Sequence, residues 1–221
     1  EVAAQALMDH NLVAVPVVDD GNRLLGMLTE NTAADITSEE VTEDAERQGG
    51  SEPLEVPYLR ASPWLLWRKR IGWLLLLFVA EAYTGTVLRH FEEEMEAVVA
   101  LAFFIPLLIG TGGNTGTQIT TTLVRAMATG QVRLRDVPAV LLKEMSTGMM
   151  IALTMALAAL IRAWMLGVGP EITLTVCLTV AAIVLWSSFV ASILPPVLKK
   201  CRVDPAVVSA PMIATIVDGT G

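Results

Sequence analysis

The stretch Gly110-Thr111-Gly112-Gly113-Asn114-Thr115-Gly116-Thr117-Gln118 lies inside a segment that is otherwise apolar enough to cross a bilayer. Polar groups stranded in hydrocarbon are costly, so a lipid-facing helix has no reason to carry so many hydroxyls and amides. Glycines let another backbone or a hydrated ion approach, and the polar side chains supply oxygens. The stretch therefore predicts the lining of a polar path through a membrane. The candidate lining residues are Gly110, Gly112, Gly113, Asn114, Gly116 and Gln118.

The composition supports a membrane protein. Of the 221 residues, 53% are hydrophobic and 17% charged, and the mean hydropathy is +0.58, which is too apolar for an ordinary soluble domain. The polar and acidic residues concentrate in 1–70, whereas 71–221 holds long apolar runs. The net charge of −8 argues against nucleic acid as a partner. Cys177 and Cys201 suggest neither a disulfide framework nor a zinc site.

Four complete membrane spans and one partial span are predicted. They cover about 71–88, 97–127, 137–165 and 172–198, with a fifth that begins near 206. Pro106 and the glycine cluster are expected to bend or loosen the second span. Because the chain starts without Met and stops inside an apolar segment, we expect a fragment at both ends.

Lysine and arginine gather on one side of these spans. The basic residues precede span one, separate spans two and three, and separate spans four and five: Arg68, Lys69, Arg70, Arg125, Arg133, Arg135, Lys199, Lys200 and Arg202. The positive-inside rule then predicts that the N-terminus and the basic loops are cytoplasmic. We expect a multi-pass protein of the plasma membrane.

Residues 1–34 have the pattern of a small α/β piece. A helix-like stretch at 3–10 precedes residues 13–20 and 21–29, whose pattern predicts a strand, a tight turn and a second strand. The pattern resembles the C-terminal part of a CBS domain, a module that often senses small ligands or ions. The alternative is another small βαβ piece.

An acidic connecting helix is predicted over 35–62. Glu40, Glu43 and Asp44 fall on one helical face, and Asp35 lies upstream. Clustered carboxylates suit hard cations such as Mg²⁺ or Ca²⁺. A solvated acidic face is the alternative reading.

Three ionisable sites fall within the spans. Asp218 lies about 13 residues into the fifth segment, where a charge is costly and usually functional. Glu81 in the first span is a similar oddity, with hydrogen bonding between helices as the simpler explanation. Lys143 and Glu144 lie near the cytoplasmic end of span three and are expected to be structural.

These features together resemble the MgtE family of magnesium channels and transporters. The resemblance rests on 107–118 (LLIGTGGNTGTQ), 134–136 (LRD), 142–145 (LKEM), 203–206 (VDPA) and 215–221 (TIVDGTG), and on the EVTED sequence at 40–44. It implies a mainly α fold: a polytopic helical membrane domain over 63–221, with five helices per subunit and the fifth truncated here, after a partial α/β CBS domain. It further implies a homodimer whose pore is lined by the second and fifth helices.

The resemblance also implies roles for single residues. Asp218 corresponds to the pore aspartate, with Ala214 and Thr215 on the pore lining, and Asp204 to an acid at the cytoplasmic pore end. The acids of the connecting helix, Asp35, Glu40, Glu43 and Asp44, correspond to a magnesium sensor that favours the closed channel.

The chain departs from the family pattern at four places: Asn31, Thr32, Ala210 and Gly219. Asn31 and Thr32 replace aspartates, which should weaken magnesium-dependent closure.

The resulting functional hypothesis is uptake of Mg²⁺ down its electrochemical gradient. Mg²⁺ is then both the transported ion and the ion that regulates the channel. Alternatives are transport of Co²⁺ or Mn²⁺, or a non-conducting regulatory subunit; a complete CBS domain could also bind a nucleotide. An enzyme is not expected, because His10 and His90 fall outside the spans and no H-E-x-x-H motif occurs.

Overall fold

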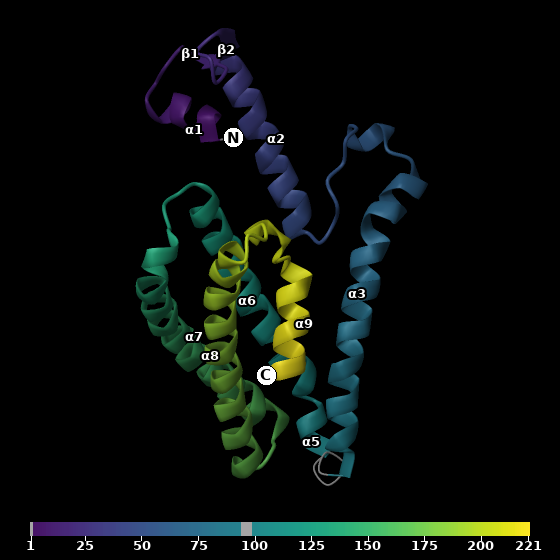
Figure 1. Cartoon of the computed structure of the whole chain (residues 1–221). Helices are drawn as coiled ribbons and strands as arrows, with labels where there is room; N and C mark the ends of the chain where they lie inside the picture. Colours follow the sequence, from purple (N-terminus) through teal and green to yellow (C-terminus); the bar gives the residue numbers. More distant parts are fainter. Residues whose placement is uncertain (1, 94–98) are drawn as a thin grey trace. The chain divides into compact units, whose positions relative to one another are not determined.

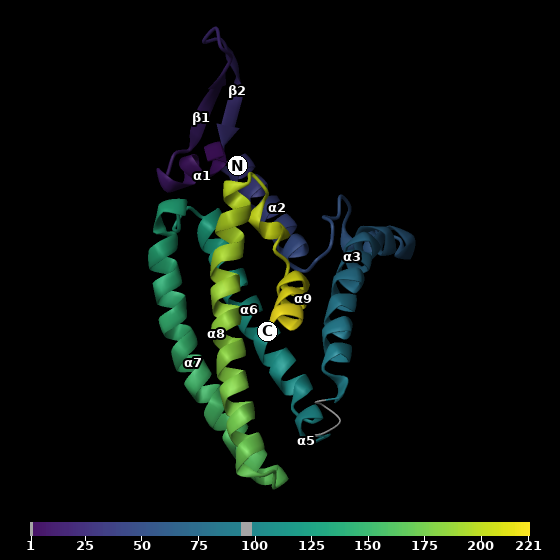
Figure 2. The ribbon, with the colours of Figure 1, turned by 60° about the horizontal axis from the view of Figure 1, so that its bottom comes forward.

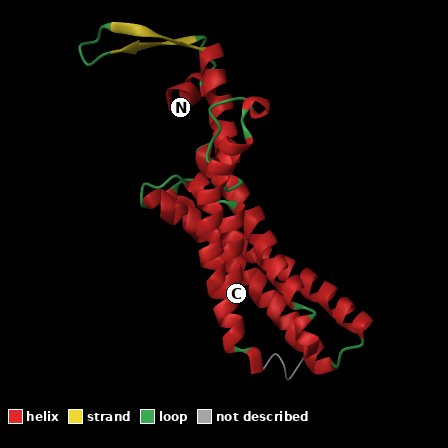
Figure 3. Ribbon diagram, turned by 90° about the vertical axis from the view of Figure 1, so that its right-hand side faces the viewer, coloured by secondary structure: helices red, strands yellow, loops and turns green. Residues whose placement is uncertain are grey.

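The computed structural model describes residues 2–93 and 99–221. The chain forms two units, one of residues 1–46 and 53–61 and one of residues 47–52 and 62–221. Helices dominate, and one two-stranded sheet lies near the N-terminus (Figure 3). The predicted fold class, a helical membrane domain preceded by a small α/β piece, is confirmed at this level.

The first unit opens with α1 (Val2–Asp9) and an antiparallel hairpin of β1 (Ala14–Val18) and β2 (Leu24–Thr29). The Asp19 carboxylate closes the hairpin turn by accepting hydrogen bonds from the backbone N–H groups of Gly21 and Arg23, at 2.9 and 2.8 Å. This is the turn chemistry expected of an aspartate at such a position. The helix and hairpin predicted from the sequence are therefore present.

The helix that follows differs from the predicted connecting helix at 35–62. α2 (Glu30–Gln48) begins directly after the hairpin, where the Thr29 hydroxyl accepts a hydrogen bond from the backbone N–H of Thr32 at 3.4 Å. It ends before Gly50, whose φ of 77° is a left-handed conformation that stops an α-helix. Residues 51–57 contain no helix, and η1 (Tyr58–Arg60) is one short 3₁₀ turn.

The described part of the second unit is built mainly of helices. Its elements are α3 (Pro63–His90), α5 (Val99–Ala102), α6 (Ile105–Ala128), η2 (Leu134–Asp136), α7 (Val137–Leu166), α8 (Pro170–Lys200), η3 (Pro205–Val207) and α9 (Ala210–Thr220). The described residues contain four helical segments long and apolar enough to cross a membrane: Pro63–His90, Val99–Ala128, Leu134–Leu166 and Pro170–Lys200. These match the four predicted complete spans; residues 97 and 98 of the second lie outside the described residues.

The second span is interrupted before its glycines. α5 ends at Ala102 and α6 begins at Ile105, with Pro106 in its first turn, where a missing N–H costs no helical hydrogen bond. The interruption lies next to Pro106, where a bend was predicted, whereas the glycine stretch itself is continuous α-helix. Side chains of the neighbouring helices α8 and α9 pack against Gly112 and Gly116.

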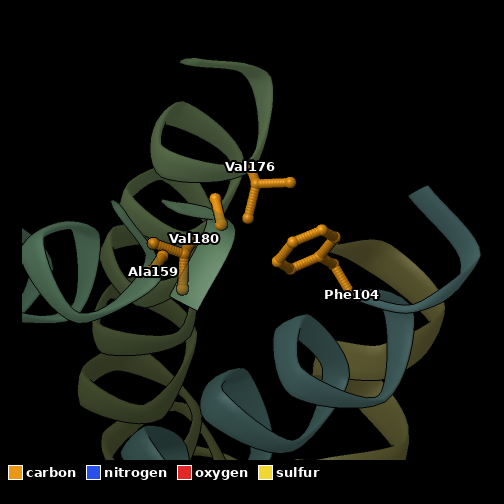
Figure 4. Packing of buried hydrophobic residues seen from close by; sticks show 5 residues of the cluster. Phe104, Ala159, Val176 and Val180 are labelled. Atoms are coloured by element: carbon orange, nitrogen blue, oxygen red, sulfur yellow. The ribbon is translucent and has the colours of Figure 1, made fainter. Parts of the chain in front are cut away.

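α8 is the central packing element of the second unit, in contact with both α7 and α6 (Figures 1 and 2). Near one end, Phe104 inserts its ring toward the α7–α8 pair (Figure 4). The buried cluster consists of Phe104, Ala159, Ala163, Val176 and Val180. α9 packs against α6, α3 and α8, and so joins the first span to the bundle.

Candidate functional site: the contact of α6 and α9 beside α3

The predicted polar motif and the predicted membrane aspartate lie next to each other. A Cβ built on Gly113 of α6 would lie 3.2 Å from the Cβ of Ala214 and 3.9 Å from the Asp218 Oδ1 atom of α9. Thr117, one turn further along α6, donates a hydrogen bond to the backbone carbonyl of Ala210 at 3.5 Å. α6 and α9 therefore run antiparallel here, with Asp218 beside the middle of the motif.

Two of the glycines act in close packing within the subunit. A Cβ on Gly112 would lie 2.7 Å from methyl groups of both Ile183 and Val217. A Cβ on Gly116 would lie 2.8 Å from the hydroxyl oxygen of Ser187, which donates a hydrogen bond to the Gly112 carbonyl at 2.7 Å. Gly112 and Gly116 thus let α8 and α9 approach α6, in the manner of small residues at membrane helix contacts. Gly112 and Gly116 were predicted to line an open path, whereas on the single chain both are buried between helices.

A different set of α6 residues forms an exposed polar stripe. Gly110, Asn114 and Gln118 are spaced by four residues and are all exposed on the single chain, whereas their neighbours in the motif are largely buried. The α6 stripe continues to the helix end with Thr121, Thr122 and Arg125. Apolar surfaces of the chain, such as that of α3 with Leu75 and Phe78, are suited to lipid, but this stripe is not.

Asp218 combines burial with missing partners. Its Oδ1 atom is buried, and no hydrogen-bond partner for it is present among the described residues. The carboxylate of Glu81 on α3 is close enough for the two charges to repel each other. Because a buried acceptor without a donor is costly, the Asp218 carboxylate is a candidate to bind a cation.

The N-terminal end of α9 and the η3 turn before it are held to α3 and to Arg47 by polar contacts. The Ser209 hydroxyl caps α9 by accepting a hydrogen bond from the backbone N–H of Met212 at 3.2 Å, and it also accepts one from Trp73 Nε1 at 3.0 Å. Asp204 forms an ion pair with Arg47 and caps η3 by accepting a hydrogen bond from the Ala206 N–H at 2.9 Å. Both carboxylate oxygens of Asp204 are therefore occupied within the chain.

Comparison with known proteins shows the family of the chain. Residues 105–221, which comprise α6 to α9, match the family model MgtE, described as a divalent cation transporter. The chain belongs to the MgtE family. It is 38% identical over 221 residues to a magnesium transporter MgtE of Thermus thermophilus, covering 100% of this chain and 49% of that protein. A magnesium transporter MgtE of Bacillus subtilis is 28% identical over 219 residues, 99% of this chain and 48% of that protein.

The chain thus spans about half the length of the curated MgtE relatives it matches. The match of the family model covers the α6 stripe, Asp204 and Asp218, but not α3 or the first unit.

The predicted sensor residues belong to the first unit of the chain, and the α6–α9 site belongs to the second. Glu40, Glu43 and Asp44 share one face of α2, as their spacing predicted, and Asp35 lies earlier on the same helix. Within residues 2–93 and 99–221, no three His, Cys, Asp or Glu side chains come together in a way that could hold a metal ion. The sensor therefore remains a prediction.

Several site residues were not singled out from the sequence. Ser187 and Arg47 acquire their roles through partners 75 and 157 residues away, so no local pattern could reveal them. Thr84 and Thr120 are buried hydroxyls without a hydrogen-bond partner among the described residues. Thr84 lies three residues after Glu81 in the first span, and two polar residues so close together in an apolar helix were the available sequence signal for a polar contact there.

Proposed function

We propose that this chain forms the conducting part of a magnesium transporter that lets Mg²⁺ enter the cell down its electrochemical gradient. The observation that carries the proposal is the buried, unpartnered Asp218 oxygen beside Gly113, next to the exposed polar stripe of α6. A carboxylate and a row of amides and hydroxyls at membrane depth have a use on an ion pathway. The names of the relatives from Thermus thermophilus and Bacillus subtilis support the choice of magnesium.

The chemistry of the site suits a hydrated ion. Mg²⁺ gives up its water reluctantly and prefers oxygen ligands at about 2.0–2.1 Å. One carboxylate per subunit, with Asn114 and Gln118 nearby on the α6 stripe, can bind the water shell without stripping it. The sequence contains no ATP-binding motif, so the membrane potential, about 2.3 kcal/mol per charge per 100 mV, and the gradient supply the driving force.

The conducting unit is a homodimer in the plasma membrane with a cytoplasmic N-terminus. A second copy that faces the α6 stripe would complete a polar path whose first half is open on the single chain. The basic residues at one end of the spans support the orientation.

Cytoplasmic Mg²⁺ closes this channel by binding the acidic face of α2. Glu40, Glu43 and Asp44 share that face, and several carboxylates on one face offer the oxygen ligands that a hard cation such as Mg²⁺ prefers. In the full-length protein, Glu40→Gln with Glu43→Gln should leave uptake open at high cytoplasmic Mg²⁺. Unchanged closure would remove the basis for this sensor.

The main test is Asp218→Asn in the full-length protein, reconstituted into liposomes that contain a magnesium-sensitive dye. Uptake should fall to the background of empty liposomes. Glu144→Gln is the matched control, since it removes a carboxylate from α7 instead of the path, and its uptake should be unchanged. Undiminished uptake by Asp218→Asn would refute the pathway, and absence of uptake by the unmodified protein would favour the non-conducting regulatory subunit. Competition by Co²⁺ and Mn²⁺ in the same assay measures selectivity.

A further inference from the structure

Glu81 is a carboxylate near the middle of the first membrane span. It lies ten residues after Ile71, so it is about 15 Å into a hydrocarbon layer of about 30 Å. Its side chain is exposed on the single chain, so packing within the subunit does not account for it. An ionisable side chain at this depth usually faces a polar path or a charged partner.

The register of α3 against α9 places Glu81 beside Asp218. Trp73 of α3 donates a hydrogen bond to Ser209 at the start of α9. Eleven residues further along α3, Thr84 lies against Gly219, which is ten residues after Ser209 on α9. The helices therefore run side by side in the same direction. Glu81 precedes Thr84 by three residues, and Asp218 precedes Gly219 by one, so their axial levels differ by about 3 Å.

Close helix contact brings a buried hydroxyl to the same place. A Cβ on Gly219 would lie 3.2 Å from Thr84 Oγ1 and 3.3 Å from the Tyr83 ring, so the glycine allows α3 to approach. Thr84 is only 7% exposed, and its Oγ1 has no hydrogen-bond partner among the described residues. Thr84 is thus a second buried oxygen, after Asp218 Oδ1, that is directed at this contact and lacks a partner.

The two acids need a counter-charge that the neighbouring helices do not provide at this level. In the described parts of α3, α6, α8 and α9, the basic side chains lie near the helix ends: Arg68, Lys69, Arg70, Arg89, His90, Arg125, Lys199 and Lys200. Glu81 and Asp218 are close enough for their charges to repel each other. A cation from solution would relieve this repulsion most effectively if it were divalent.

We infer that Glu81 is a second carboxylate of the Asp218 site, and that the two acids with the Thr84 hydroxyl bind a hydrated divalent cation in mid-membrane. The inference rests on the proposed function and adds α3 to the pathway formed by α6 and α9. The carboxylate and hydroxyl oxygens accept hydrogen bonds from the water shell of the ion. Two negative charges on one subunit strengthen the preference for a divalent over a monovalent cation.

The test compares Glu81→Gln with Glu81→Asp in the full-length protein in liposomes. Glu81→Gln keeps the size and removes the charge, so the Mg²⁺ concentration for half-maximal uptake should rise on the order of tenfold, with weaker exclusion of Na⁺. Glu81→Asp keeps the charge, so its half-maximal Mg²⁺ concentration and its exclusion of Na⁺ should both stay close to those of the unmodified protein. An unchanged half-maximal concentration and selectivity in Glu81→Gln would overturn the inference. Equal defects in both variants would mean that the shape of the side chain matters and not its charge, which would also overturn it.

A second measurement uses the unmodified protein and does not depend on a variant folding. A membrane-permeant carbodiimide labels carboxyl groups within the bilayer, and mass spectrometry can locate the label on Glu81. Saturating Mg²⁺ should slow this labelling several-fold, whereas the same concentration of Na⁺ should not. Labelling that is indifferent to Mg²⁺ would refute the inference even if Asp218→Asn abolishes uptake. Undiminished uptake by Asp218→Asn would instead refute the proposed function itself.

Discussion

Replacing Gly112 by alanine should destabilise the membrane unit measurably. The added methyl group would lie 2.7 Å from methyl groups of Ile183 on α8 and Val217 on α9, about 1 Å inside normal contact. Both neighbours are buried, at 8% and 1% exposed, and β-branched side chains in a helix have little rotamer freedom. The helices must therefore move apart, and overpacking of this kind costs about 1–3 kcal/mol.

Gly85→Ala is the matched control, because Gly85 also lies inside a helix and a Cβ there would have nothing within 4 Å. Both variants share the gain in helix propensity, so their difference isolates the packing cost. Unfolding in mixed micelles of increasing SDS content, followed by tryptophan fluorescence, should give folding equilibrium constants that differ roughly 5- to 150-fold. If the two variants agree within about 0.5 kcal/mol, the close contact of α6 with α8 and α9 is wrong.

Two further predictions concern the N-terminal end of α9 and the η3 turn before it. Ser209→Ala removes the cap and the acceptor for Trp73, and should cost about 1–3 kcal/mol in the same unfolding assay. Trp73→Phe should cost about 1 kcal/mol, and the double variant less than the sum, whereas strict additivity would argue against the Trp73–Ser209 hydrogen bond. The Arg47–Asp204 pair is 34% and 40% exposed, so a double-mutant cycle of Arg47→Gln and Asp204→Asn should give a coupling of at most about 1 kcal/mol. That coupling should largely vanish in 1 M NaCl; a coupling that resists salt would contradict a solvent-screened pair.

The sequence predicts the spans well because hydrophobic length and basic flanks are local properties. The four complete spans have their counterparts in α3, α5–α6, α7 and α8. Helix ends set by backbone conformation were harder to predict. The connecting helix was expected to reach residue 62, but Gly50 adopts a left-handed conformation and α2 stops at Gln48.

The site was predicted in composition but only partly in geometry. The pairing of the glycine-rich motif with Asp218 appears in the structure, since both carry polar groups that a membrane helix does not otherwise tolerate. The division of labour among the glycines could not be predicted, because it depends on which face of α6 meets α8. Gly112 faces Ile183 and Val217, whereas Gly110 has nothing within 4 Å of its Cβ position.

The contact between α3 and α9 has a consequence for the order of assembly. Trp73 and Ser209 are 136 residues apart in the chain, and translation at about 5–20 residues per second separates their synthesis by roughly 7–30 s. During that time α6, α7 and α8 can already pack against one another. α3 meanwhile lacks α9, the helix whose N-cap Ser209 accepts the Trp73 hydrogen bond and whose Gly219 contacts Thr84. Among the four membrane-spanning segments of the described residues, the one synthesised first is thus the last to acquire its packing partner.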